Sequence, residues 1–282
     1  MKPFHTVSVI APGLLGGSIL KTLRRRAPAT RLKVCARREA TRLTISGANL
    51  ADEVCAEPAS AAADSDLVIL CTPIQAMTDV TRQMLPALKR EAVVTDVGSV
   101  KASVHAALAP LLAGRARWLG SHPMAGSENS GLAAARGDLF DQAVTILTPV
   151  DADADTLYRL RAFWELLGCR VLFLTPEAHD AAVAQVSHLP HLLAALLVNS
   201  VSDASLSVAG PGFRDTTRIA AGPPEMWADI LRANRAAIIS AVEKLQGETR
   251  TALAALREDD YAGLLKLLNA ASERRRKVIF NG

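Results

Sequence analysis

Apolar and polar positions in the first half of the chain alternate between two patterns. Short runs of β-branched and other apolar residues are separated by stretches in which apolar side chains recur at helical spacing. This alternation predicts parallel βαβ units, with helices on both faces of a sheet. We expect strands at 7–10, 32–35, 67–70, 92–95, 118–120, 143–147 and 170–174, and helices at 14–26 and 74–88.

The pattern changes after residue 175. Long Ala- and Leu-rich segments follow, interrupted between 203 and 225 by glycine and proline residues. We expect helices over 178–202, 226–246 and 248–277. The pattern therefore predicts a Rossmann-type, doubly wound α/β domain at 1–175 and an all-helical domain at 176–282.

Composition narrows the class of protein. Apolar residues make up 50% and charged residues 21% of the 282 residues, which is typical of a globular chain. The net charge of +4 suits an anionic ligand but is too small for a nucleic-acid surface. The longest apolar runs, such as 192–198, fall short of the roughly 20 residues of a membrane span, and no signal peptide is evident. Four scattered cysteines predict reduced thiols, so we expect a cytoplasmic protein that binds neither nucleic acid nor membrane.

A glycine-rich turn follows the first predicted strand. Gly13 and Gly16 occupy the second and third positions of a G-x-G-x-x-G fingerprint, and Ala11 replaces its first glycine. The turn opens a helix, whose N-terminal N–H groups bind anions such as a pyrophosphate. We expect a nicotinamide dinucleotide to bind at Gly13, Leu14, Leu15 and Gly16.

The end of the second predicted strand bears on the choice of cofactor. An acidic residue there favours NAD, whereas an arginine accommodates the 2′-phosphate of NADP. Arg37 occupies about the position where the acid would be expected, and Arg38 follows it. We expect both arginines to contact the cofactor and favour NADP, with NAD as the alternative.

Polar residues gather after three further predicted strands. Thr72 and Pro73 follow one strand, Ser99 follows the next, and His122 follows a third. Because the carboxyl ends of parallel strands share one edge of a sheet, these residues should lie near the nicotinamide ring. An imidazole can take a proton from a hydroxyl while a hydride leaves the same carbon, which makes His122 a candidate base.

Five segments, taken together, resemble one known family. They are GLLGGS at 13–18, DVGSVK at 96–101, SHPMAG at 121–126, HLPH at 188–191 and GFRDTTRIA at 212–220. In this order they resemble the prephenate/arogenate dehydrogenases, and the resemblance covers nearly the whole chain. It implies a Rossmann-type domain followed by a helical domain that forms a homodimer.

The resemblance also implies a reaction. Family members oxidatively decarboxylate prephenate to 4-hydroxyphenylpyruvate, or arogenate to tyrosine, with reduction of a nicotinamide cofactor. A histidine at the position of His191 tends to accompany prephenate use in this family. We therefore expect a prephenate dehydrogenase of tyrosine biosynthesis, with arogenate as the alternative substrate.

Site residues follow from the resemblance position by position. His122 would be the base, Ser99 would contact the substrate hydroxyl and orient the imidazole, and Arg218 would bind a substrate carboxylate. His191 would face the substrate side chain, with His188 close by. Positions that line or gate the site in the family correspond to His179, Ser127 and Glu128.

Other interpretations of the same residues stay open. His188 and His191 share a helix face but lack a further ligand nearby, so we expect no metal. The arginine runs at 24–26 and 274–277 favour solvated helix ends, and surplus apolar residues at 192–198 and 228–242 favour a homodimer interface. A β-hydroxyacid-type dehydrogenase and a catalytically silent nucleotide sensor are the alternative functions.

Overall fold

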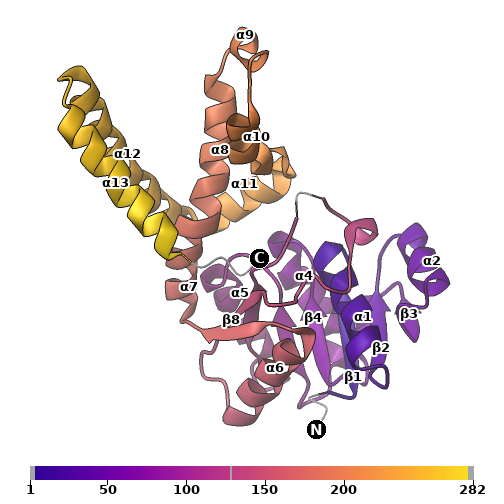
Figure 1. The fold of residues 1–282 in the computed structure, drawn as a ribbon. Coiled ribbons are helices and arrows are strands. Elements are labelled where there is room, and N and C mark those ends of the chain that lie inside the picture. The colour runs from indigo at the N-terminus through magenta and orange to yellow at the C-terminus, as the bar shows by residue number, and fades with distance from the viewer. Residues whose placement is uncertain (1–3, 128, 279–282) are drawn as a thin grey trace.

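The computed structural model describes residues 4–127 and 129–278. Its first part contains a six-stranded parallel sheet in the order β3-β2-β1-β4-β5-β6 (Figure 1). The first three strands form one half of the sheet and the next three form the other half, so the strand order reverses between β1 and β4. Dinucleotide-binding sheets open a crevice at this point. The strands are β1 (Thr6–Ile10), β2 (Arg31–Cys35), β3 (Glu53–Cys55), β4 (Leu67–Leu70), β5 (Val93–Asp96) and β6 (Arg117–Trp118).

Helices cover both faces of this sheet because its strands are apolar on both sides. Leu67 and Ile69 of β4 pack into one buried cluster, and Val68 and Leu70 pack into the other. The first cluster lies under α1 (Leu14–Arg26) and α6 (Ala154–Leu167), and the second lies under α3 (Pro58–Ala62), α4 (Ile74–Met84) and α5 (Ala102–Leu112). The remaining short elements are α2 (Glu39–Gly47), η1 (Leu85–Ala87) and η2 (Leu132–Ala134).

A second, three-stranded sheet departs from the all-parallel arrangement that we expected. It consists of β7 (Gly120–Pro123), β8 (Val144–Thr148) and β9 (Arg170–Phe173), and β7 runs antiparallel to β8. The single strand expected at 118–120 is divided between the two sheets. The division occurs at Gly120, where a Cβ would lie 2.7 Å from Oγ1 of Thr148. The lack of a side chain thus allows the crossing that puts His122 on β7.

A long helical run opens the second part of the chain. It comprises α7 (Pro176–Val183), a π-helical turn η3 (Ala184–His188) and α8 (Leu189–Ser200). Pro190 has no N–H to bond the carbonyl four residues earlier, which accounts for the irregular turn before it. By length and composition this run could cross a membrane. Its histidines and Asp180 are buried against the rest of the chain, whereas only 28% of its most apolar 18-residue window is buried.

The remaining helices form two projecting arms (Figure 1). One arm holds α8 with α9 (Asp203–Leu206), α10 (Pro211–Thr217), η4 (Arg218–Ala221) and α11 (Pro224–Ala233), and the other holds α12 (Arg235–Arg257) and α13 (Tyr261–Lys277). The helix ends differ from those expected. Gly247, which we expected to separate two helices, lies inside α12. Asn234 ends α11, and Asp260 begins α13 by accepting a hydrogen bond from the Gly263 N–H at 2.9 Å.

The arginines at 24–26 form the last turn of α1, where Arg25 and Arg26 are exposed as expected, and they also contact neighbouring loops. Arg24 pairs with Asp52 at 2.8 Å, and Arg26 pairs with Asp141 at 2.6 Å. Arg25 donates to the carbonyl of Gly137 at 2.7 Å. The end of α1 is therefore fastened to two loops of the first domain.

Candidate active site

A cavity of about 810 Å³ lies between the carboxyl ends of the parallel strands and the first helical arm. Both parts of the chain contribute to its walls. Of the residues that the sequence singled out, those that line it are Gly13, Leu14, Leu15, Gly16, Ser99, His122, Ser127, His191 and Arg218. Those that do not are Arg37, Arg38, Thr72, Pro73, His179 and His188. Glu128 lies outside the described residues.

The glycine-rich turn has the shape that a pyrophosphate requires. At Gly13 a Cβ would meet nothing within 4 Å, so the backbone is open toward the cavity. At Gly16 a Cβ would lie 2.9 Å from Val9 and 3.1 Å from the Cys71 sulfur, so only glycine lets α1 approach the sheet this closely. The first turn of α1 has no acidic residue and no side-chain cap. Its N–H groups are therefore available to an anion.

Ala11 explains why a glycine is usual at the first position of the fingerprint. Its φ of 59° lies in the left-handed region, which costs an alanine roughly 1 kcal/mol. Its N–H bonds the carbonyl of Cys35 at 2.9 Å, so the turn keeps its course despite the methyl group. The substitution therefore introduces local strain without closing the site.

The ends of β2 and β4 flank this turn. Arg37 and Arg38 are exposed where β2 meets α2, and Arg42 donates to the carbonyls of Ala36 and Arg37 at 2.9 and 2.8 Å. No carboxylate lies between Cys35 and Arg38. After β4, the hydroxyl of Thr72 is buried without a hydrogen-bond partner. These features fit the path of an extended dinucleotide.

The segment between β7 and β8 lies across α1. Lys21 donates to the carbonyl of Ala135 at 2.6 Å, and the Arg136 N–H donates to Oγ of Ser18 at 3.0 Å. A Cβ at Gly17 would lie 2.6 Å from Leu132, so α1 and this segment are in close contact. Ser127, nearer the start of the segment, is exposed and borders the cavity.

His122 occupies the inner wall of the cavity and is only 7% exposed. Burial, together with His179, Lys101 and His188, holds the pKa of His122 well below its ordinary value of 6.5. The imidazole is therefore neutral at physiological pH and able to accept a proton. Ser99 lines the same cavity from the end of β5.

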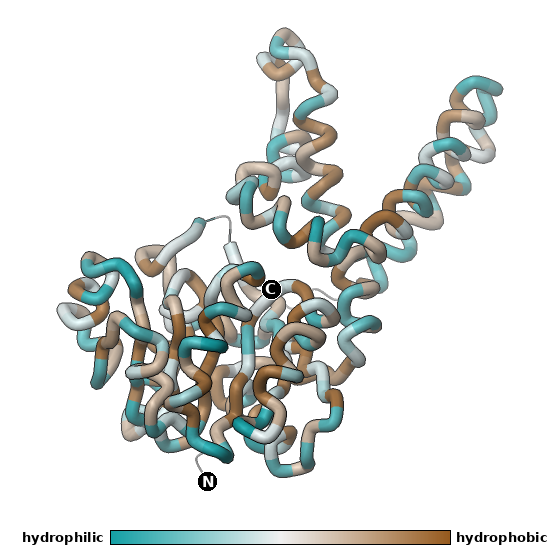
Figure 2. Tube along the Cα trace, turned by 180° about the vertical axis from the view of Figure 1, so that it is seen from behind, coloured by the Kyte–Doolittle hydropathy of each residue, from teal (hydrophilic) through white to brown (hydrophobic). Residues whose placement is uncertain are grey.

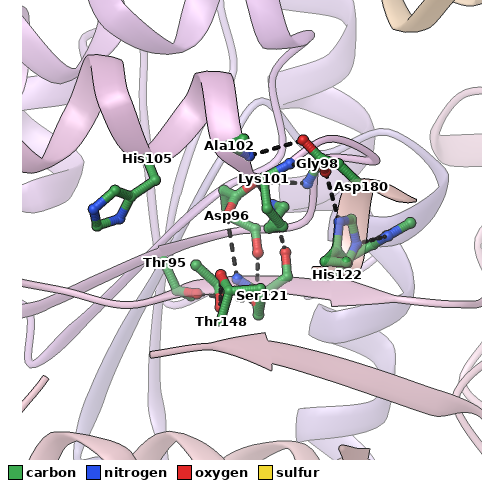
Figure 3. A network of polar contacts seen from close by, with 12 residues as sticks. Thr95, Asp96, Gly98, Lys101, Ala102, His105, Ser121, His122, Thr148 and Asp180 are labelled. Atoms are coloured by element: carbon green, nitrogen blue, oxygen red, sulfur yellow. Dashed lines mark hydrogen bonds and ion pairs between the residues drawn. The ribbon is translucent and has the colours of Figure 1, made fainter. Parts of the chain in front are cut away.

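A chain of short contacts leads away from His122 (Figure 3). Its Nδ1 lies 2.8 Å from Nε2 of His179, and Nδ1 of His179 lies 2.8 Å from Oδ1 of Asp180. The Asp180 carboxylate also accepts from the N–H groups of Lys101 and Ala102, at 2.7 and 2.9 Å. The predicted site residue His179 thus contacts the candidate base and is completely buried.

A buried ion pair supports the strand that carries His122. Lys101 and Asp96 are 1% and 0% exposed and bonded to each other. Lys101 also donates to the Ser121 carbonyl at 2.9 Å, and Asp96 accepts from the Ser121 N–H at 3.2 Å (Figure 3). The pair therefore fixes the backbone directly before His122.

The opposite wall comes from the helical part of the chain. The ring of His191 stacks on Trp227 at 3.5 Å between centroids and 14° between planes. A Cβ at Gly222 would lie 2.9 Å from Trp227 and 3.1 Å from His191, so this glycine permits the stack. Arg218 lies exposed at the cavity border, on η4. Sequence reasoning missed Trp227, although a tryptophan in a chain with 4% aromatic residues was a signal.

His188 lies behind this wall rather than on it. The residue is 0% exposed, and burial lowers its pKa to about 4. Its Nδ1 lies 3.1 Å from Nδ2 of Asn234, and its ring meets Trp227 edge-on. Across residues 4–127 and 129–278, no three His, Cys, Asp or Glu side chains are grouped so as to hold a metal ion.

Comparisons with known proteins agree with this architecture. Residues 19–173 match the nucleotide-binding domain of prephenate dehydrogenase, and residues 175–270 match its dimerization domain. The chain belongs to the prephenate dehydrogenase family. It is thus an oxidoreductase with a nucleotide-binding fold, and a nicotinamide cofactor is the family's oxidant.

Relatives within the prephenate dehydrogenase family cover nearly the full chain. The cyclohexadienyl dehydrogenase of Zymomonas mobilis is 34% identical over 93% of this chain and 92% of its own. The Aquifex aeolicus prephenate dehydrogenase, solved with hydroxyphenyl propionate and NAD+, superposes with a TM-score of 0.89 at 28% identity, over 98% of both chains. The Synechocystis arogenate dehydrogenase gives 0.82 at 30% identity, over 97% of this chain and 100% of that one.

Proposed function

We propose that this enzyme oxidatively decarboxylates prephenate to 4-hydroxyphenylpyruvate in tyrosine biosynthesis, with NADP as the preferred oxidant. One observation carries the proposal. A neutral, buried imidazole, an open helix N-terminus and a guanidinium border the same cavity, at His122, α1 and Arg218. Those are the groups needed to accept a proton, hold a dinucleotide and bind a carboxylate.

His122 takes the proton of the ring hydroxyl as the carbon that bears it is oxidised. The nicotinamide, when bound, supplies the acceptor for the hydride. The bond between the ring and its carboxylate then breaks, CO₂ leaves, and the electron pair enters the ring to make it aromatic. The ring oxygen takes the proton back from His122 and becomes the phenol hydroxyl. Ser99, beside the base in the cavity wall, orients the hydroxyl toward the imidazole. The protein's main task is thus to align the ring and move one proton.

The helical wall holds the acidic end of the substrate. Arg218 binds a carboxylate through two parallel N–H donors, a geometry that a guanidinium favours. His191, held flat by Trp227, faces the side chain of the substrate. Ser127 borders the cavity entrance and adds a hydroxyl donor there. His188 supports the wall from behind, and Glu128 stays an expectation from the sequence.

NADP preference rests on the end of β2. Exposed Arg37 and Arg38 offer two cations where a carboxylate would bind an unmodified ribose. Gly13, Leu14, Leu15 and Gly16 receive the pyrophosphate, and Thr72 and Pro73 border the path of the dinucleotide beyond β4. NAD is the alternative oxidant.

Arogenate is the alternative substrate, because it differs from prephenate only in carrying an amino group in place of the side-chain keto group. A β-hydroxyacid-type dehydrogenase is less well supported, since the cavity formed by the described residues has no lysine in its walls. A silent nucleotide sensor would have no use for a base beside the hydride path.

The assembly that we propose is a homodimer of two-domain subunits, divided at 175/176, in the cytoplasm. The second part of the chain matches a dimerization domain. Hydrophobic residues recur along both arms (Figure 2). Large apolar side chains are exposed there, among them Leu196, Ile239 and Leu256 at 53%, 49% and 63%. Exposed apolar area of this kind favours a second copy of the chain as the partner.

A spectrophotometric assay tests the function. Purified enzyme is mixed with prephenate or arogenate and with NAD or NADP, and the appearance of reduced cofactor is followed. We expect the highest kcat/KM for prephenate with NADP. Faster turnover of arogenate would transfer the assignment to that substrate, and no turnover in any of the four combinations would refute it.

A further inference from the structure

The deepest part of the site continues beyond the cavity, in side chains that no substrate can touch. His179 is 0% exposed and Asp180 is 6% exposed, and neither lines the cavity. Both belong to α7, in the helical part of the chain, whereas His122 belongs to β7. Residues that are this buried and this close to a base require a role other than substrate binding.

We propose that Asp180 and His179 are positioning residues that set the tautomer of His122 and stabilise it after it takes the proton. This inference rests on the proposed function, in which His122 is the base. The arrangement consists of three groups in a row: a carboxylate, a first imidazole and a second imidazole whose far nitrogen is left for the cavity.

The hydrogen positions follow from the contacts of Asp180. Its carboxylate accepts from two backbone N–H groups at the start of α5, and a carboxylate has no hydrogen of its own to donate. Nδ1 of His179, 2.8 Å away, therefore carries a hydrogen. A neutral His179 then has a lone pair at Nε2.

The same reasoning applies to His122, the base. Nδ1 of His122 lies 2.8 Å from Nε2 of His179. Because that nitrogen can only accept, Nδ1 of His122 must carry a hydrogen. The hydrogen at Nδ1 leaves Nε2 of a neutral His122 with a lone pair, and Nε2 is the nitrogen left for the cavity. Without His179 and Asp180, the imidazole could equally hold its hydrogen at Nε2, where it could not accept one from the substrate.

The row of Asp180, His179 and His122 also offsets the cost of placing a positive charge on a buried imidazole. Burial makes a positive charge on His122 unfavourable, and Lys101 adds a like charge nearby. When Nε2 takes up the substrate's proton, the charge spreads toward His179, whose other side already faces a carboxylate. Asp180 thus supplies the compensating negative charge through His179, which lies between it and His122. The charged or titratable groups around His122 are His179 and Asp180 of α7, His188 of η3, Asp96 of β5, and Lys101 just before α5.

The main test replaces Asp180 with asparagine, which keeps the shape and removes the charge. For Asp180→Asn we expect kcat to fall by about 10²–10⁴-fold, with little change in the KM for the cofactor. The acidic limb of the pH–rate profile should move to lower pH, because a base without its carboxylate binds a proton less tightly. An unchanged limb and an unchanged kcat would overturn the proposal.

A matched pair at His179 separates hydrogen bonding from packing. In His179→Gln an amide can still accept from His122 and donate to Asp180, whereas His179→Leu can do neither. We expect the glutamine variant to retain clearly more turnover than the leucine variant. Thr175→Ala is the control, because it removes the side-chain cap of α7, which accepts from the Ala178 N–H at 3.2 Å, without touching the row. It should lower the unfolding temperature and leave the pH limb in place.

A measurement without substrate tests the histidine tautomers independently of the proposed reaction. The ¹⁵N side-chain resonances of the histidines, assigned through the variants at 122 and 179, report which ring nitrogen carries hydrogen. We expect His122 and His179 both to carry it at Nδ1, and Asp180→Asn to redistribute it. Hydrogen at Nε2 of wild-type His122 would refute the tautomer assignment, even in an enzyme that oxidises prephenate. If the tautomers are as expected but no substrate is turned over, the proposed function fails instead.

Discussion

At the scale of single residues, His122 combines two properties that usually oppose each other. It is buried enough to stay uncharged, yet it borders a cavity where a hydroxyl can reach it. A low pKa makes a histidine a weaker base, so its environment must favour the protonated form at the moment of transfer. The neighbouring polar groups, rather than the imidazole alone, therefore determine how well it works.

Replacing the base gives the first prediction. For His122→Asn we expect kcat to fall by about 10²–10⁴-fold, because the proton of the hydroxyl loses its acceptor. Cofactor binding should change little, since the pyrophosphate is expected to bind backbone N–H groups at the start of α1 rather than this side chain. Steady-state kinetics together with equilibrium binding of NADP check this. Full turnover in the variant would remove His122 from the mechanism.

Buried histidines also make stability depend on pH. The pKa values of His122, His188 and His191 are all lowered by burial, that of His188 to about 4. Below the ordinary histidine value of 6.5, the unfolded chain takes up protons that the folded chain does not, so the unfolding free energy falls. The unfolding free energy should be highest above pH 6.5 and should decrease as the pH falls toward 4. Urea unfolding at about pH 7.5 and about pH 5 measures the difference, and equal values would contradict it.

The sequence predicted the residues of the cavity better than the residues behind it. His122, Ser99 and Arg218 stand in local motifs, so their neighbours in the chain identify them. Asp180 and Trp227 stand in no such motif, and their contacts depend on how α7 and α11 pack. Such contacts cannot be inferred from one sequence.

At the scale of elements, the turn from β1 into α1 and the end of β2 form one side of the proposed cofactor site. Both were predictable, because strand, glycine turn and helix follow one another directly in the chain. The division at Gly120 was not predictable in this way. It depends on Thr148, which is distant in the sequence and adjacent only in the folded sheet.

The end of β2 gives a prediction about cofactor choice. In Arg37→Asp a carboxylate replaces a cation, so the 2′-phosphate is repelled while a free ribose hydroxyl gains an acceptor. The ratio of kcat/KM for NADP to that for NAD should fall by at least about tenfold, the loss of roughly one charge-assisted contact. Lys89→Asp, with a cation paired to Asp66 at 2.9 Å, is a control outside the cavity walls. An unchanged ratio in Arg37→Asp would contradict the assignment of β2.

At the scale of the whole molecule, the two arms extend away from the α/β part (Figure 2). Apolar side chains are exposed on both of them. The predicted fold class, an α/β part followed by a helical part, is confirmed. It was predictable because the hydrophobic periodicity of the sequence changes sharply along the chain. The ends of individual helices were less predictable. Gly247 does not end α12, which continues to Arg257, because a single glycine costs a helix only about 1 kcal/mol.

The arms give a prediction about assembly. Leu256 of α12 is 63% exposed, and in Leu256→Asp a charge would have to be buried in the dimer interface. We expect the variant to sediment as a monomer, or to dissociate at concentrations at which the wild type does not. Leu43→Asp is the matched control, because Leu43 is 66% exposed on α2 of the other part of the chain. Dimers of equal stability in both variants would exclude this surface.

The carboxylate of Asp180 has a consequence for how the molecule comes apart. It closes the first turn of α5, which belongs to the α/β part, from a helix that belongs to the other part. Melting of the helical part would leave that turn without its acceptor and the ammonium of Lys101 open to water. The two parts are therefore expected to lose their structure in a single cooperative transition.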